Sequence, residues 1–114
     1  MTQTHALILS IAIEAVVAFV VVRGLRWGGG TRAALAATVG TLVTHPFVWY
    51  AVPRLEGPLG YGPAVVLIES GVVLAESVAY RLIVPLDWRR ALPASLIANA
   101  ASTGAGLLYY ALAG

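Results

Sequence analysis

Four apolar segments, each close to the length of a membrane span, dominate the chain. They cover residues 5–22, 33–52, 62–84 and 91–113. An α-helix needs about 20 predominantly apolar residues to cross the hydrocarbon core of a bilayer, because each residue advances the helix by about 1.5 Å. Four such segments leave no room for a separate soluble domain in a chain of 114 residues. The pattern therefore predicts a single domain of four transmembrane helices.

The connections between these segments are short. At roughly 6 to 12 residues, they leave room only for antiparallel packing of neighbouring helices. The predicted fold is an all-α membrane protein, an up-down bundle of four transmembrane helices. Pro53 and Pro58 are expected in the second connection, and Asp87 is expected to cap the fourth helix. Pro46, inside the second segment, should free the carbonyl of Leu42 and kink that helix.

The composition excludes several classes of function. Hydrophobic residues make up 60% of the chain and charged residues 11%, whereas soluble domains are about 25% charged. The net charge of +2 comes from arginines in the connections and not from a continuous basic surface for nucleic acid. The chain has no cysteine, which excludes a disulfide framework and a cysteine nucleophile. No motif of a zinc protease, a nucleophile elbow or a phosphate loop occurs, so no cofactor is predicted and an enzymatic role stays undecided.

The positions of the arginines predict the orientation of the bundle. Those around the first and third connections are Arg23, Arg26 and Arg32, and Arg81, Arg89 and Arg90. The second connection has only Arg54, which Glu56 offsets. Cytoplasmic loops of membrane proteins carry an excess of arginine and lysine. Both arginine-rich connections are therefore predicted to be cytoplasmic, and both termini to lie on the outer side of an inner or plasma-type membrane.

Two acids, Glu69 and Glu76, interrupt the otherwise apolar third segment. An acid at the centre of a transmembrane helix costs about 2.5 to 3.5 kcal/mol on insertion scales, so such residues are rare and usually functional. A separation of seven residues is within about 20° of two full turns and corresponds to a rise of about 10 Å. Both side chains are therefore predicted to lie on one face of the helix.

The other three segments carry polar residues at similar depths. Glu14 lies in the middle of the first segment, His45 in the second and Asn99 in the fourth. Thr41 precedes His45 by four residues and Ser102 follows Asn99 by three, and these spacings place each pair on one face of its helix. Outward-facing acids would meet lipid, so these faces are expected to converge inside the bundle.

Small residues at a spacing of three or four are expected to let the helices approach closely. The stripes are Ala33, Ala37, Gly40 and Thr44 on the second segment, Gly71, Ala75 and Ala79 on the third, and Ala94, Ala98, Ala101 and Ala105 on the fourth. Trp49, near the end of the second segment, is interpreted as an anchor at the membrane interface.

Two interpretations of the acids remain open. In the first, Glu69 and Glu76 are protonated members of a hydrogen-bond network that fixes the helix register; in the second, they bind a cation or exchange protons during transport. His45 either donates to Thr41 or to a freed backbone carbonyl, or belongs to a proton relay. A metal site of His45, Glu69 and Glu14 has no supporting spacing motif, and no metal is predicted.

The resulting hypothesis is a small membrane protein that binds or transports a proton, a cation or a small polar solute. The predicted site residues are Glu69, Glu76, Glu14, His45, Asn99, Thr41 and Ser102. Two alternatives stay open, namely an accessory subunit of a larger membrane complex and an intramembrane enzyme acting on a lipid or isoprenoid. The expected partners are the lipid bilayer and further copies of the chain or such a complex. Nucleic acid is not expected as a partner.

Overall fold

The computed structural model describes residues 2–113, which form four α-helices. The helices are α1 (Gln3–Gly24), α2 (Gly30–Leu59), α3 (Tyr61–Ile83) and α4 (Trp88–Ala113). All four are long and apolar enough to cross a membrane. The prediction of an all-α chain with four span-length helices is therefore confirmed. Helices α1, α2 and α4 extend beyond their apolar segments, whereas α3 begins and ends one residue earlier than predicted.

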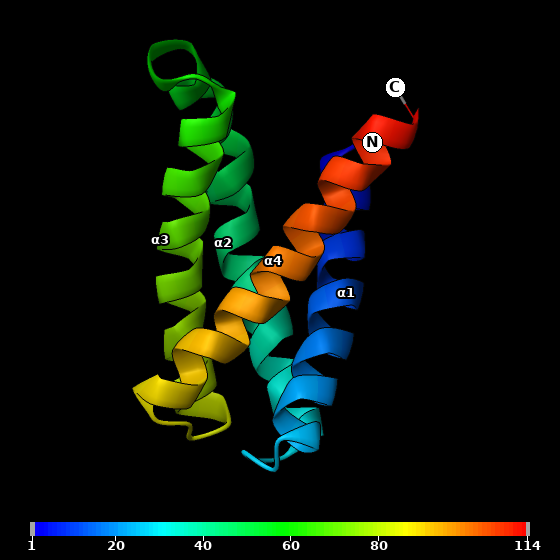
Figure 1. The fold of residues 1–114 in the computed structure, drawn as a ribbon, viewed down its shortest axis with the longest axis vertical. Coiled ribbons are helices and arrows are strands. Elements are labelled where there is room, and N and C mark those ends of the chain that lie inside the picture. Colours follow the sequence, from blue (N-terminus) through cyan, green and yellow to red (C-terminus); the bar gives the residue numbers. More distant parts are fainter. Residues whose placement is uncertain (1, 114) are drawn as a thin grey trace.

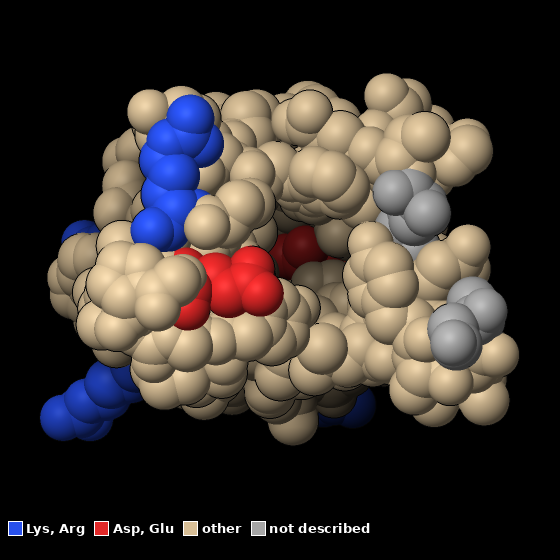
Figure 2. All heavy atoms as spheres, turned by 90° about the horizontal axis from the view of Figure 1, so that it is seen from above, with Lys and Arg blue, Asp and Glu red and all other residues tan. Residues whose placement is uncertain are grey.

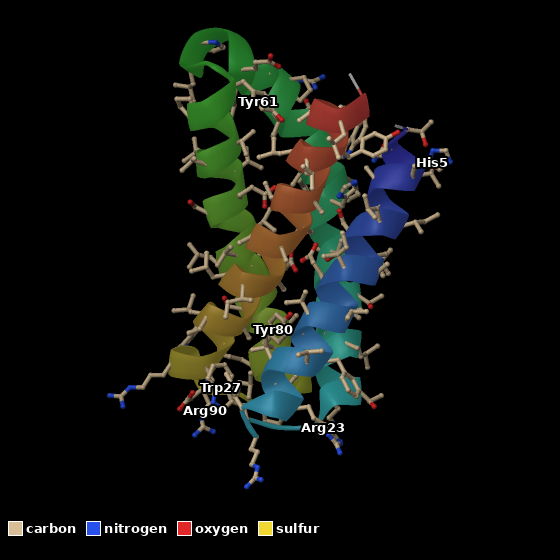
Figure 3. The ribbon with its side chains drawn as sticks, turned by 45° about the vertical axis from the view of Figure 1, so that its right-hand side comes forward. His5, Arg23, Trp27, Tyr61, Tyr80 and Arg90 are labelled. Carbon is tan, nitrogen blue, oxygen red and sulfur yellow. The ribbon has the colours of Figure 1, made fainter. Side chains whose placement is uncertain are left out.

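Each helix packs against two neighbours, in the closed order α1, α2, α3, α4 and back to α1. Successive helices run in opposite directions, so that α1 begins and α4 ends at the same end of the bundle (Figure 1). We call this the terminal end. The opposite end carries the α1–α2 and α3–α4 connections and is called the arginine end. Arg23 and Arg90 project from the arginine end, whereas His5 and Tyr61 lie at the terminal end (Figure 3).

The second helix is longer than predicted, because α2 continues through Pro53 and Pro58. The predicted loop is reduced to Gly60, whose φ of 86° is a left-handed conformation that residues with a Cβ rarely adopt. Arg54 stabilises the turn that contains Pro53. Its guanidinium lies 3.6 Å from the centroid of the Tyr50 ring and donates to the Tyr50 carbonyl at 2.9 Å. A proline removes only its own N–H from the helical ladder, here the one that would bond to the Trp49 carbonyl, so the other hydrogen bonds of the helix can continue past it.

The apolar core fills the arginine end. Its buried residues are Ala18 and Val22 of α1, Ala33, Ala36 and Ala37 of α2, Tyr80 of α3, Val84 and Leu86 after it, and Ala91 and Ala94 of α4. Alanines dominate this cluster, so the helix backbones approach closely here. The arginine end is consequently closed by tightly packed small side chains.

Two of the three predicted small-residue stripes pack as expected, and the third does not. The α2 stripe is buried from Ala33 to Thr44, and Ala94 and Ala98 of α4 are buried as well. On α3, however, Gly71 and Ala75 are exposed, and only Ala79 packs against the core. This helix instead turns Val72, Glu76 and Tyr80 inward, a face about 100° away from the small residues. The acids, and not the small residues, decide which side of α3 faces the interior.

Asp87 caps α4 as the sequence predicts. Its Oδ1 accepts a hydrogen bond from the backbone N–H of Arg90 at 3.1 Å, which satisfies one of the free donors in the first helical turn. We expect Asp87→Ala to lower the free energy of unfolding by about 0.5 to 2 kcal/mol. The measurement is reversible unfolding in mixed micelles. Asp87→Asn keeps a capping oxygen and serves as the control, so an equal loss in both variants would contradict the cap.

Candidate functional site

A cavity of about 250 Å³ lies between the four helices and opens toward the terminal end. Its mouth is formed by Tyr61, Leu107 and Tyr110, near the ends of α3 and α4, and by Trp49 and Val52, about two to three turns inside the end of α2. Its floor is formed by Glu14, Thr41, Thr44, Glu76 and Asn99, from the middle of the four helices. Below the floor the apolar core closes the bundle.

The surface agrees with this description. Seen from the terminal end, the molecule is hollowed between the helices, and an acidic side chain is visible deep inside the opening (Figure 2). In the ribbon, the α2–α3 pair and the α1–α4 pair diverge toward the same end (Figure 1). The cavity lies where the two helix pairs diverge. At the arginine end the pairs pack closely, so the cavity is closed there.

All seven residues predicted from the sequence line this cavity: Glu14, Thr41, His45, Glu69, Glu76, Asn99 and Ser102. Glu76 is only 1% exposed and Glu14 only 3%. Glu69, His45 and Ser102 are partly buried, since they lie along the cavity wall. The structure thus brings together polar residues from every helix, as the face analysis predicted.

The closest acid pair is not the one that the sequence suggests. The carboxyl of Glu14 lies beside that of Glu76, and it also neighbours the hydroxyls of Thr41 and Ser102. Glu69 shares the inner face of α3 but lies nearer the mouth, beside Thr103. Because α1 and α3 are diagonal in the bundle, two acids from opposite helices meet in its centre. The shared face of Glu69 and Glu76 is confirmed, but the paired carboxyls are those of Glu14 and Glu76.

Glu76 is held in place by two features of α2. The hydroxyl of Thr44 lies 3.2 Å from Glu76 Oε2 and 2.9 Å from the carbonyl oxygen of Gly40. Gly40 lies directly against the Glu76 side chain, because a Cβ built on Gly40 would lie 2.7 Å from Glu76 Cγ. No residue larger than glycine fits at position 40 without displacing the Glu76 side chain.

Five buried side-chain atoms have no hydrogen-bond partner in the part of the chain that the structure describes. They are Glu14 Oε1, Thr41 Oγ1, His45 Nε2, Glu76 Oε1 and the Tyr80 hydroxyl. An unsatisfied buried polar group costs about 1 to 3 kcal/mol, and native proteins pair nearly all such groups with protein or water. Four of the five belong to residues that line the cavity. The free polar atoms are thus concentrated around the cavity.

His45 does not make the contacts that the sequence suggests. Its Nε2 and the Thr41 hydroxyl are both without a partner, so the predicted bond between them is not formed. The imidazole instead faces Trp49, with ring centroids 6.1 Å apart. Among residues 2–113, no three His, Asp or Glu side chains are close enough to hold a metal ion. The alternative metal set of His45, Glu69 and Glu14 is therefore not assembled.

Two polar residues of α4, Ser95 and Asn99, have a structural role. Ser95 Oγ donates to the carbonyl of Val73 at 2.9 Å and so joins α4 to α3. Asn99 Nδ2 donates to the Ser95 carbonyl at 2.9 Å, and it also lies 3.3 Å from Ser95 Oγ. The amide nitrogen of Asn99 is thus used within α4, while the residue still borders Glu76 at the floor.

Three residues around the site, Thr44, Trp49 and Tyr80, were not predicted from the sequence to belong to it. Thr44 was assigned only to helix packing, although a threonine one turn from Thr41 on an inward face was a sufficient signal. Trp49 was assigned to the membrane interface but lines the mouth. Tyr80 is predicted from its spacing to share the face of α3 that carries the acids, but no site role was assigned to it. It is fully buried below the acids, with its hydroxyl free.

No protein-family model, no curated protein and no solved structure matches this chain.

Proposed function

We propose that this chain is an integral membrane carrier that takes a small polar or cationic solute into the cavity from the terminal end. Binding is coupled to proton exchange at Glu14 and Glu76. The observation that supports this proposal most strongly is the group of free buried polar atoms around a cavity that is open at one end only. Such a site has the capacity to recognise a solute and to hold it without letting it leak across the bundle.

Several features support placement in a membrane. The outer surface exposes large apolar side chains on every helix, including Val20, Phe47, Leu67, Leu74 and Leu112. The longest dimension of the bundle is 41 Å, and a bilayer with its headgroup regions is about 40 to 45 Å thick. With the arginine end cytoplasmic, as the charge distribution predicts, the cavity opens to the outer side.

Paired carboxyls at membrane depth are well suited to bind and release a proton. Two adjacent carboxylates without a cation repel one another, and removing both charges from water is costly. A proton shared by the pair relieves this cost, and a bound cation would relieve it equally well. Binding of a cation and release of a proton are thus coupled through the same two oxygens, Glu14 Oε1 and Glu76 Oε1.

The packed arginine end makes a carrier a better proposal than a channel. A solute at the floor has no polar path beyond Tyr80, because alanines and valines fill the space below it. Release on the other side requires the two helix pairs to separate there and to close at the mouth. Pro46 lies inside α2 at the level of the cavity and is the proposed hinge. We predict that a homo-oligomer of the chain supports this movement.

The test uses purified protein in vesicles that contain a pH-sensitive dye and carry an imposed pH gradient. Small ammonium, carboxylate and neutral polar compounds are added outside, one at a time. At least one of them should dissipate the gradient faster with the protein than in protein-free vesicles. If none does, the carrier proposal is wrong, and a partner that co-purifies in equal amount would instead support an accessory subunit.

Because the chain has no cysteine, single cysteines report directly on access to the cavity. We expect Ser102→Cys, on the cavity wall, to react with a membrane-impermeant thiol reagent added on the side of the terminal end. Ala94→Cys, two turns away in the packed core of the same helix, should not react from either side. Equal labelling of both positions, or labelling of Ser102→Cys only from the arginine end, would contradict a cavity open at the terminal end.

A further inference from the structure

We propose that the solute is a primary or secondary organic ammonium ion with a small apolar body. This inference rests on the proposed function of the cavity and specifies its substrate class. It follows from three independent properties of the lining, namely its charge, its free hydrogen-bonding atoms and the distribution of its apolar side chains.

The charge of the lining selects against anions. Three acids, Glu14, Glu69 and Glu76, border the cavity, and no arginine is among the described residues that line it. The arginine nearest in sequence to the mouth, Arg54, is exposed and engaged with Tyr50. An anionic solute would therefore face carboxyls without a compensating cation, whereas a cation supplies the charge that the site lacks.

The free atoms at the floor match the donors of an ammonium group. Glu14 Oε1 and Glu76 Oε1 are acceptors when ionised, and the Thr41 hydroxyl accepts as well. A primary ammonium carries three N–H donors on one nitrogen. Because Glu14 neighbours both Glu76 and Thr41, rotation of these buried side chains toward the cavity would bring the three acceptors to one such nitrogen. Hydrogen bonds between charged partners are about twice as strong as those between neutral ones. A quaternary ammonium, which has no N–H, would leave the same atoms unsatisfied.

The upper part of the cavity suits an apolar body. Val48, Val52, Val65 and Leu107 line it together with the rings of Trp49, Tyr61 and Tyr110. A cavity of about 150 Å³ is sufficient for benzene, so about 250 Å³ accommodates one ring with a short side chain. Phenethylammonium has this size, with its charge at one end and its ring at the other.

The experiment compares three probes of nearly equal shape by calorimetry on the protein in lipid nanodiscs. The probes are phenethylammonium, 2-phenylethanol and phenylacetate, which differ in the charge of the terminal group. Phenethylammonium should bind at least about tenfold more tightly than the alcohol, because a hydrogen bond to a charged group contributes about 1.5 to 3 kcal/mol. Phenylacetate should not bind. Titrations in buffers of different ionisation enthalpy should show that a proton is released when the ammonium binds.

Two variants show whether the acids are responsible. Glu76→Gln should weaken phenethylammonium binding by about tenfold or more and remove the proton release. Glu56→Gln, the same change at an exposed position outside the cavity, should leave binding unchanged. Circular dichroism and size-exclusion profiles equal to those of the parent protein exclude misfolding as the cause.

The outcomes separate this inference from the proposed function. If 2-phenylethanol or phenylacetate binds as tightly as phenethylammonium, the ammonium class is wrong, whereas the cavity remains a solute site. If none of the probes binds although Ser102→Cys is labelled from the terminal end, the substrate class alone is overturned. If no probe binds and Ser102→Cys is unreactive, the cavity is closed to solutes and both proposals fall.

Discussion

Replacing Glu14 and Glu76 together by glutamine should reduce solute-driven proton movement to the level of protein-free vesicles. Glutamine has nearly the volume of glutamate, but its amide neither binds nor releases a proton near neutral pH. The change therefore removes proton exchange and keeps the shape of the side chain. The two carboxyls are neighbours at the floor, and each has an oxygen without a hydrogen-bond partner. The measurement is the rate at which an imposed pH gradient decays after the solute is added.

Two further variants make this result specific. Glu56→Gln changes an exposed acid near the end of α2 and should leave the rate unchanged. Glu69→Gln changes an acid on the cavity wall that is separate from the pair, and it should slow proton movement without abolishing it. Normal movement in the Glu14→Gln, Glu76→Gln double variant would exclude these carboxyls as the proton-exchanging groups.

Gly40→Ala should destabilise the protein although the same change usually stabilises a helix. Alanine is favoured over glycine in a helix by about 0.5 to 1 kcal/mol, but here the added Cβ would lie 2.7 Å from Glu76 Cγ. Extra atoms in a well-packed interior cost about 1 to 3 kcal/mol, so the packing cost outweighs the gain. The displaced Glu76 would also lose its contact with the Thr44 hydroxyl. Both effects lower the apparent melting temperature in detergent.

Gly71→Ala is the matched control for this change. Gly71 lies inside α3 on an exposed side, and a Cβ there meets no atom within 4 Å. The melting temperature of Gly71→Ala should equal or exceed that of the parent protein. If Gly40→Ala is as stable as Gly71→Ala, the close approach of α2 to Glu76 does not constrain the acid as the structure indicates.

The helices were predictable because length and hydropathy alone decide them. Segments of about 20 apolar residues have few alternatives to a helix when backbone groups must be satisfied internally. The end of α2 was not predictable in the same way. Pro53 and Pro58 signal a break, but α2 continues through both, and Arg54 contacts Tyr50 in the turn that contains Pro53.

The composition of the site was predictable, but its pairing was not. Polar residues at membrane depth must avoid lipid, and this one requirement identifies Glu14, His45, Glu76 and Asn99 from the sequence. Which acids meet depends on the rotation and tilt of each helix, and no local pattern encodes either. The sequence therefore favoured Glu69 with Glu76 on one helix, whereas the structure joins Glu76 to Glu14 across the bundle.

The sealed arginine end also determines where a transmembrane voltage would act. Polar side chains reach from the mouth to the floor, so most of the electric field would fall across the apolar half below Tyr80. A cation arriving at Glu14 and Glu76 would cross little of that field. Moving one elementary charge through the whole potential involves about 2.3 kcal/mol per 100 mV. In the proposed orientation, a potential that is negative inside would hardly alter binding from outside, and it would act on delivery to the cytoplasm only where the return of the exchanged proton does not balance the charge of the cation.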